Sequence, residues 1–173
     1  MENVEGLIKG AAWSYVQKIY KQLHDIGYQV KHWLLKGEQM GVPQTRHRVF
    51  FIAVRNDLGF DFDDLDMAFN YEPIPFGKIK EGKGDSVSSE CARLLNLAKP
   101  QHKSLAEILV DNAEKRSRFN EKIIWDFDIC CTVQSHGMYR ANDKTKLSLE
   151  DYRNAQTFPR DYKFDSTSQA AYI

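Results

Sequence analysis

The 173-residue sequence lacks the features that mark several large classes of protein. No apolar run approaches the roughly 18 residues that a membrane-spanning helix needs. Acidic Glu2 and Glu5 stand near the N-terminus, where a secretory signal peptide would carry basic residues. Lys and Arg number 24 and are matched by 24 Asp and Glu, so the chain lacks the overall basic charge typical of nucleic-acid-binding proteins. The sequence predicts a cytoplasmic protein without a membrane partner, in which any contact with nucleic acid is local.

Cysteine is also scarce. The three cysteines are an odd number, and Cys130 and Cys131 are neighbours, which disfavours a disulfide framework. A zinc site built from these two thiols and His136 is disfavoured because it lacks paired ligands of the Cys-x-x-Cys type. We therefore expect reduced, buried thiols and no metal site.

The first third of the sequence has the pattern of an α/β protein. Apolar residues between positions 7 and 26 recur at three- and four-residue intervals, which predicts an amphipathic helix that ends before Gly27. Residues 28–35 fit a strand. Positions 49–54 are apolar on both faces, as expected for a strand that helices cover on each side. Helix, strand, loop and strand together indicate part of an α/β sheet.

The composition changes after residue 57. Between Asp57 and Glu72 the chain has six acidic residues and no basic one, and a Pro- and Gly-rich stretch follows, which predicts a solvated boundary. Short helices are expected over 89–98 and 104–116, and strands over 123–125 and 129–133. These elements predict a small α+β unit of roughly 80 residues. A capping box at Ser148 and Asp151 predicts a last short helix, which Pro159 ends.

The most unusual local pattern spans residues 41–48 and reads GVPQTRHR. Side chains alternate along an extended chain, so Gln44, Arg46 and Arg48 would point to one face. Arginine is costly to bury without a partner, so two guanidinium groups at the mouth of an apolar strand indicate an anionic or polar ligand. The alternative is a solvated strand start whose basic residues serve solubility.

Three segments, in this order, resemble motifs of the DNA cytosine-5 methyltransferases. Residues 2–4 read Glu-Asn-Val, and residues 41–48 resemble the eighth motif, Gly-Val-Pro-Gln-x-Arg-x-Arg before an apolar strand. Residues 146–164 resemble the ninth motif, with Leu-Ser, Thr-Phe-Pro and Asp-Tyr in the family's order. The family carries a variable target-recognition domain between its eighth and ninth motifs, so the middle of the chain matches by position only.

The resemblance implies an α/β fold. It would be the C-terminal portion of a Rossmann-like, S-adenosylmethionine-dependent methyltransferase sheet with an inserted small α+β target-recognition domain. Residues 1–58 would be a section of the catalytic domain, 59–146 the target-recognition domain, and 147–173 a return segment to the catalytic domain. The first and last of these are expected to lie together in one layer.

The resemblance also implies roles for single residues. Glu2 would protonate or hydrogen-bond ring N3 and the exocyclic amine of a flipped cytosine, and Arg48 would hold the base O2 and orient Glu2. Arg46 would reach the nucleophile loop or a phosphate. Double-stranded DNA is the expected partner, since the polar loop after residue 131 has side chains that can read base edges, although an ordinary surface loop fits equally. The expected DNA-binding residues are Gln44, Gln134, Ser135, His136 and Arg140.

Two segments of the family do not occur in this sequence, namely its glycine-rich cofactor loop and its Pro-Cys-Gln nucleophile loop. Carbon 5 of cytosine takes a methyl group only after a thiolate has added to carbon 6. We therefore expect this chain alone neither to bind S-adenosylmethionine tightly nor to methylate DNA, although the complete enzyme uses that cofactor. An N-terminal methyltransferase chain that carries the Pro-Cys-Gln loop, or a second copy of this chain as a homo-oligomer, is expected to cover the bare sheet edges.

Two functions remain open from the sequence. The chain is a fragment or subunit of a DNA cytosine-5 methyltransferase that helps bind DNA and hold the flipped cytosine, or it is a catalytically inactive remnant that acts as a DNA- or protein-binding module. Both functions keep the same motifs.

Overall fold

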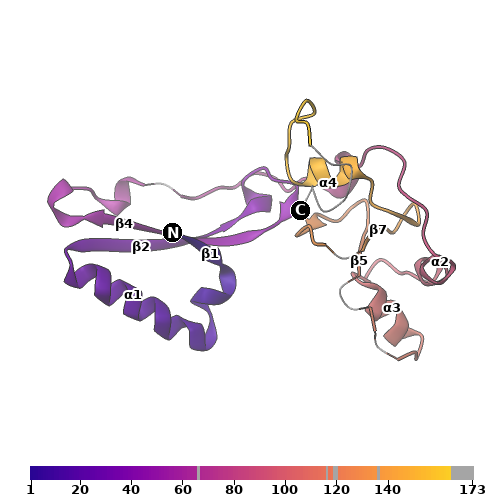
Figure 1. Ribbon diagram of the computed structural model, residues 1–173, viewed down its shortest axis with the longest axis horizontal. Helices are drawn as coiled ribbons and strands as arrows, with labels where there is room; N and C mark the ends of the chain where they lie inside the picture. Colours follow the sequence, from indigo (N-terminus) through magenta and orange to yellow (C-terminus); the bar gives the residue numbers. More distant parts are fainter. Residues whose placement is uncertain (66, 116, 119–120, 136, 165–173) are drawn as a thin grey trace. The chain divides into compact units, whose positions relative to one another are not determined.

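The computed structural model describes residues 1–65, 67–115, 117–118, 121–135 and 137–164. The chain forms two compact units (Figure 1). Unit 1 consists of residues 1–40 and 46–71, and unit 2 consists of residues 41–45 and the chain from residue 72 onward. Among the residues described, no helix is long and apolar enough to span a membrane.

Unit 1 is an antiparallel sheet of three strands with one helix packed on it (Figure 1). Strand β4 (His47–Arg55) lies between β1 (Glu2–Val4) and β2 (Tyr28–Lys36). Helix α1 (Trp13–Asp25) covers one face, where its fully buried Val16 contacts Val49 and Phe51 of β4. Single 3-10 turns complete the unit: Glu5–Ile8, Gly10–Ala12, Gly37–Gln39, Asn56–Leu58 and Phe62–Asp64.

The end of α1 confirms the sequence prediction, whereas its start differs. Gly27 has a φ of 85°, and its N–H donates to His24 O at 3.0 Å, which is the expected glycine cap. The helix begins at Trp13 and not near residue 7 because Gly10 adopts a φ of 56°, outside the helical range. Two 3-10 turns take the place of the first helical turns.

Strand β4 is covered by a helix on one face only, so the expectation of helices on both faces is wrong for the described part of unit 1. Val49 and Phe51 are buried under α1, but Phe50, which points to the other face, is 36% exposed. On that face, Phe62 packs its ring on Trp33 with the ring centroids 5.7 Å apart. The acidic segment after residue 57 is therefore no solvated linker throughout, since part of it folds back on the sheet and belongs to unit 1.

Unit 2 contains the short helices and strands expected for the middle of the chain. Its helices are α2 (Ser89–Asn96), α3 (Leu105–Asp111) and α4 (Leu149–Ala155), with a 3-10 turn at Phe76–Lys78. Its strands are β3 (Gln44–Thr45), β5 (Lys122–Ile124), β6 (Cys130–Cys131), β7 (Met138–Arg140) and β8 (Thr145–Lys146). Strand β7 pairs in parallel with β5 and antiparallel with β8, and β3 pairs in parallel with β6. One apolar cluster joins α2 and α3 to β5, and a second surrounds Phe76.

Helix α4 packs within unit 2. Tyr152 and Ala155 are buried in the cluster around Phe76 and Met138. The apolar face of this helix finds its partners in the segment that precedes it in the chain, which local patterns do not reveal. The functional boundaries at residues 58 and 146 stay a prediction, and residues 165–173 of the predicted return segment lie outside the described residues.

Candidate functional site

Glu2 and Arg48 form an ion pair on the sheet of unit 1. In the antiparallel register, Glu2 lies opposite Phe50 and Val4 lies opposite Arg48. Residues two apart on a strand share a face, so both side chains project from the face opposite to α1. Arg48 Nε lies 2.9 Å from Glu2 Oε1. The structure thus contains the contact by which Arg48 was expected to orient Glu2, while the catalytic roles of the two residues stay predictions.

The two members of this pair differ in exposure. The Arg48 side chain is 23% exposed, and a second of its nitrogens, NH1, donates to His47 O at 2.8 Å. The Glu2 side chain is 52% exposed. Two contacts therefore hold the guanidinium, while half of the carboxylate surface remains accessible to a ligand.

Two further polar residues, Arg46 and His47, lie at the start of β4, next to this pair. Arg46 precedes β4 and is exposed, and among the described residues its guanidinium makes no ion pair. His47 points to the α1 face, where its Nε2 lies 2.7 Å from Glu38 Oε1 and its Nδ1 lies 3.4 Å from Glu5 Oε2. The motif alone gives no sign of a role for His47, because its two carboxylate partners come from two separate turns that precede the motif.

Gln44 is buried, so its assignment to DNA does not fit the described structure. It is 1% exposed and lies in unit 2, where its Nε2 donates to Ala155 O at 3.1 Å. Period-2 alternation was assumed to continue from Gln44 to Arg46, but β3 and β4 are two separate strands in two units. Gln44, Arg46 and Arg48 therefore do not alternate along one continuous strand.

Arg140 is likewise buried, which corrects its assignment as a DNA-binding residue. It lies in β7, is 3% exposed, and donates through Nε to Asp151 Oδ2 at 2.7 Å. Its NH2 group donates to Glu81 O at 2.6 Å, and its NH1 group donates to Gly82 O at 3.1 Å. A guanidinium whose nitrogens are all occupied inside the protein cannot read a base edge.

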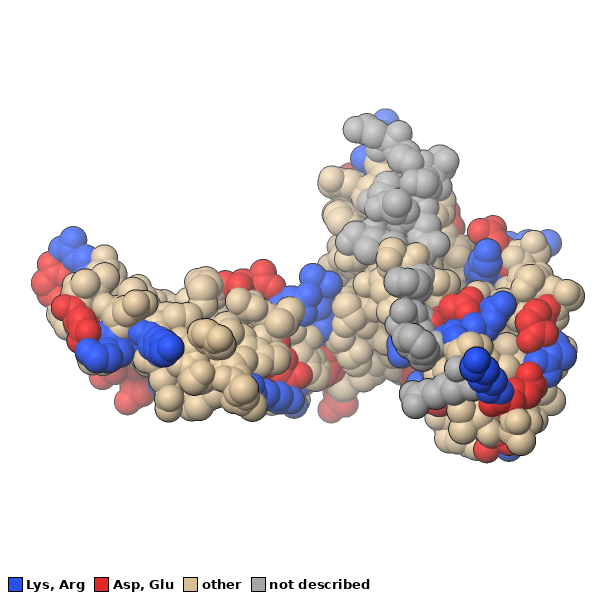
Figure 2. Space-filling model, turned by 60° about the horizontal axis from the view of Figure 1, so that its bottom comes forward, with Lys and Arg blue, Asp and Glu red and all other residues tan. Residues whose placement is uncertain are grey.

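The remaining expected DNA contacts lie in the loop between β6 and β7. Ser135 is exposed and Gln134 is half-buried, whereas His136 lies outside the described residues. Figure 2 shows basic and acidic side chains intermixed on the face in view, as the balanced composition predicts. Attraction to DNA would therefore come from a few local side chains.

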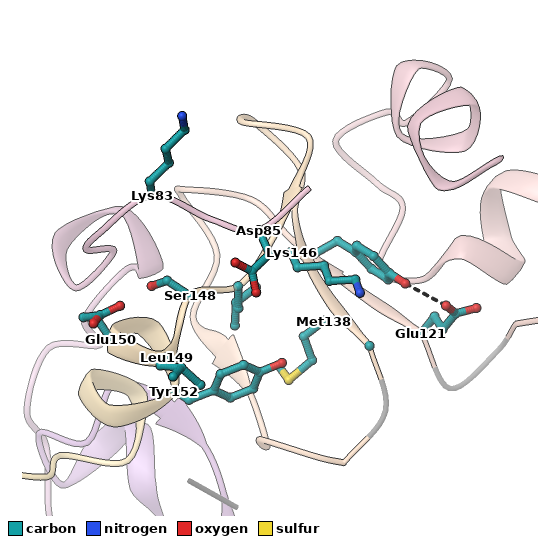
Figure 3. Close-up of a pocket in the computed structure, with 12 residues that line it drawn as sticks. Lys83, Asp85, Glu121, Met138, Lys146, Ser148, Leu149, Glu150 and Tyr152 are labelled. Atoms are coloured by element: carbon teal, nitrogen blue, oxygen red, sulfur yellow. Dashed lines mark hydrogen bonds between the residues drawn. The ribbon is translucent and has the colours of Figure 1, made fainter. Parts of the chain in front are cut away.

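Unit 2 also contains a cavity of about 550 Å³ that sequence analysis missed (Figure 3). Asp85, Lys146 and Glu150 line it, together with Met138 and the ring of Tyr152. Burial raises the pKa of Tyr152 well above its ordinary value, so this hydroxyl stays protonated. The lining residues come from segments far apart in the sequence, and no local pattern joins them.

The environments of Cys130 and Cys131 disfavour a role as nucleophile. Cys91 and Cys130 are buried, as expected, and Cys131 is partly buried. Burial raises the pKa of both the Cys130 and the Cys131 thiols, which lowers the fraction of reactive thiolate at neutral pH. Within the described residues, no group of three or more His, Cys, Asp or Glu side chains could hold a metal ion.

The family profile for C-5 cytosine-specific DNA methylases matches residues 1–173. The chain belongs to this family. Type II methyltransferase M.MthTI of Methanothermobacter thermautotrophicus is 25% identical to this chain in an alignment of 186 positions that covers 99% of the chain and 53% of that protein. M.NgoFVII of Neisseria gonorrhoeae is 39% identical over 61 residues, which are 35% of the chain and 16% of that protein.

Solved structures show the same mixed α/β fold. A variant of Spodoptera frugiperda DNMT2 has a TM-score of 0.60 at 15% identity, and the match covers 99% of this methylase chain and 59% of that chain. The Entamoeba histolytica methyltransferase EhMeth has a TM-score of 0.55 at 13% identity, covering 99% and 54% of the two chains. The methylase chain spans about half the length of M.MthTI.

The part of the chain that the structure describes has no strand that turns through glycines directly into a helix. A nucleotide-like cofactor is commonly held where a strand turns through glycines directly into a helix. In unit 1, two 3-10 turns that contain Gly6 and Gly10 separate β1 from α1, so the strand does not turn directly into the helix. We assign no residue of this methylase chain to the cofactor.

Proposed function

We propose that the chain is the C-terminal part of a DNA cytosine-5 methyltransferase of a restriction-modification system. Unit 1 holds the flipped cytosine, and exposed residues in the region between β4 and α4 bind double-stranded DNA as a target-recognition domain. The observation that carries the proposal is the ion pair between Glu2 and Arg48, because it joins the Glu-Asn-Val motif to the Arg-x-Arg motif on one face of one sheet.

The chemistry of this pair suits a cytosine ring. A protonated carboxyl donates to ring N3, and a carboxylate oxygen accepts from the exocyclic amine, so Glu2 can serve the N3 side of the base. A guanidinium donates to carbonyl oxygen, so Arg48 can serve O2. A base can reach these groups only after it has left the DNA stack. The exposed half of the Glu2 side chain provides access for such a base.

The thiolate and the methyl donor would come from a segment other than these 173 residues. The sequence has no Pro-Cys-Gln triplet, and burial suppresses ionisation of Cys130 and Cys131. Bound S-adenosylmethionine would supply the methyl group, held by that other segment. The residues of this chain would bind and orient the base and exclude water from it. By itself, the 173-residue chain would then transfer no methyl group.

The decisive experiment reconstitutes the reaction. The purified chain is mixed with a fragment of a type II relative that ends before its Glu-Asn-Val motif, and transfer of labelled methyl groups to DNA is measured. Transfer should appear only in the mixture. In Arg48→Ala the rate should fall by about 10²–10³, the usual loss when a donor to the reacting group is removed.

Arg55→Ala is the matched control, because Arg55 lies at the other end of β4 and is exposed with Asp57 as its partner. Its rate should equal that of the unaltered chain. Methyl transfer by the chain alone, or an unchanged rate in Arg48→Ala, would contradict the proposal. DNA binding without any transfer in the mixture would favour the inactive binding module.

A further inference from the structure

The cavity in unit 2 (Figure 3) is bordered by a short segment that hydrogen bonds hold at both ends. This segment spans residues 81–85 and reads EGKGD. The carbonyls of its first two residues accept from the buried Arg140 of β7 at 2.6 and 3.1 Å. At its other end, Asp85 O accepts from Lys146 N–H of β8 at 3.0 Å. The segment is therefore a fixed wall of the cavity.

Gly84 shows how closely this wall lies against β8. A Cβ atom at position 84 would collide with Thr145 Oγ1 and with Lys146 O, so a larger residue would displace the strand. Glycine in such a place marks a close approach of two backbones. A stretch whose composition is typical of a solvated linker thus forms a preformed wall, and a preformed site lowers the entropy cost of binding a ligand.

Charged side chains of both signs line the cavity without partners. Those that make no ion pair and no side-chain hydrogen bond with any residue that the structure describes are Lys83, Asp85, Lys146 and Glu150. Glu121 also lines the cavity, but its carboxylate already accepts from a tyrosine hydroxyl at 2.7 Å (Figure 3). The cavity therefore offers two ammonium donors and two carboxylate acceptors to a ligand.

Apolar side chains contribute the rest of the chemical character of the cavity. They are Met138, Leu147, Leu149 and the ring of Tyr152. The volume of about 550 Å³ lies within the usual range for ligand pockets, roughly 300–1,000 Å³. A ligand that suits this lining has a largely apolar body with hydrogen-bond donors and acceptors along its edge. A nucleobase has this form.

We propose that the cavity in unit 2 binds an unpaired guanine base. Guanine alone among the four DNA bases has two adjacent N–H donors, on N1 and N2, which match the two oxygens of one carboxylate, while its O6 and N7 accept from an ammonium group. Asp85 is the assigned acceptor and Lys146 the assigned donor, because the hydrogen bond between their backbones places them side by side.

A guanine of DNA and a free guanine nucleotide present the same edge to the cavity. Base pairing occupies N1, N2 and O6, so a guanine of DNA has to be unpaired before it can bind. That the base belongs to DNA rests on the proposed function, whereas the binding of guanine does not.

Methionine-methyl NMR of the intact chain tests the proposal. Met138 lines the cavity and is the only methionine of unit 2, whereas Met1, Met40 and Met67 belong to unit 1. Guanosine 5′-monophosphate should shift the Met138 signal and leave the others in place. Inosine 5′-monophosphate lacks only the amino group on N2 of guanine, and its Kd should be about tenfold higher. No shift of the Met138 signal at about 10 mM nucleotide, or equal Kd values, would overturn the proposal.

Asp85→Asn removes the carboxylate and keeps both the size of the side chain and the backbone bond to β8. The Kd for guanosine 5′-monophosphate should rise about tenfold, and the preference over inosine 5′-monophosphate should disappear. Asp64→Asn is the matched control, because Asp64 is an exposed aspartate of unit 1 that does not line the cavity. It should bind both nucleotides as the unaltered chain does. Unchanged binding by Asp85→Asn would contradict the proposal.

A DNA duplex identifies the source of the base. A duplex with one unpaired guanine should bind about tenfold more tightly than the fully paired duplex, and Asp85→Asn should abolish this difference. A Met138 shift with the nucleotide but no gain from the unpaired guanine would support guanine binding and reject DNA as its source. If the nucleotide shifts the Met138 signal but the reconstituted mixture transfers no methyl group, the proposed function fails and the guanine site stands.

Discussion

Replacing Arg140 with methionine should destabilise unit 2 strongly, because it leaves a buried carboxylate without its cation. Arg140 is 3% exposed and Asp151 is fully buried. Breaking a buried ion pair by removing one partner costs about 3–5 kcal/mol. Urea slopes for a unit of this size are about 1–2 kcal/mol per molar, so the unfolding midpoint should fall by roughly 1.5–5 M.

The loss of stability in Arg140→Met should also depend on pH, and the structure predicts its direction. Burial raises the pKa of Asp151, and hydrogen bonds from the Glu81 and Ser148 amides and from Arg140 oppose that rise. Without Arg140, the folded-state pKa should rise further above the unfolded value. A group with a raised folded-state pKa stabilises the fold below its unfolded pKa, and this contribution is lost as the pH rises through the folded-state pKa. The difference in stability between the unaltered chain and Arg140→Met should therefore become smaller as the pH falls from neutral toward about 4.

Fluorine NMR of fluorotryptophan-labelled protein can follow the two units separately. Trp125 reports on unit 2, while Trp13 and Trp33 report on unit 1. In urea, only the Trp125 midpoint should shift in Arg140→Met. Arg93→Met is the matched control, since Arg93 is an exposed arginine of unit 2 that pairs with Glu90 and Glu114, and it should shift the midpoint little. An unchanged Trp125 midpoint, or a deficit that grows at acid pH, would refute the reasoning.

Two further outcomes can be measured on the same protein. Thr157→Gly should raise the stability of unit 2 by about 1 kcal/mol, because Thr157 is exposed with a φ of 61°, which glycine adopts without strain. Thermal unfolding would test this expectation, and a lower Tm would contradict it. Cys130 and Cys131 should resist a thiol reagent at pH 8 in the folded chain and react after unfolding in urea, because burial raises the pKa of both thiols. Rapid labelling of the folded chain would contradict this prediction, because it would show that the thiols are accessible.

Local signals predicted the elements that depend on neighbouring residues. The capping box at Ser148 is present in full, since Asp151 N–H donates to Ser148 Oγ and Ser148 N–H donates to Asp151 Oδ2. The glycine cap after α1 is also as expected. Both depend on residues within four positions of each other, so the sequence contains all the information that they require.

Contacts between distant segments account for what the sequence did not reveal. Gln44 and Ala155 are 111 positions apart, and a short motif gives no sign that they meet. Phe62 lies in an acidic segment whose composition is typical of a solvated linker, yet its ring packs on Trp33. One buried aromatic ring outweighs the local composition there, because its burial stabilises more than exposed carboxylates cost.

Among the arginines that the sequence placed at the site, the number of occupied nitrogens separates structural from ligand-binding side chains. Every nitrogen of Arg140 donates to a partner in unit 2. Arg48 uses Nε for Glu2 and NH1 for a backbone carbonyl, which leaves NH2 for a ligand. Arg46 is exposed and makes no ion pair within the described residues, so all the N–H donors of its guanidinium group are available to a phosphate. A guanidinium can bind a ligand only through N–H donors that have no partner within the protein. Arg46 and Arg48 have such donors, whereas Arg140 has none.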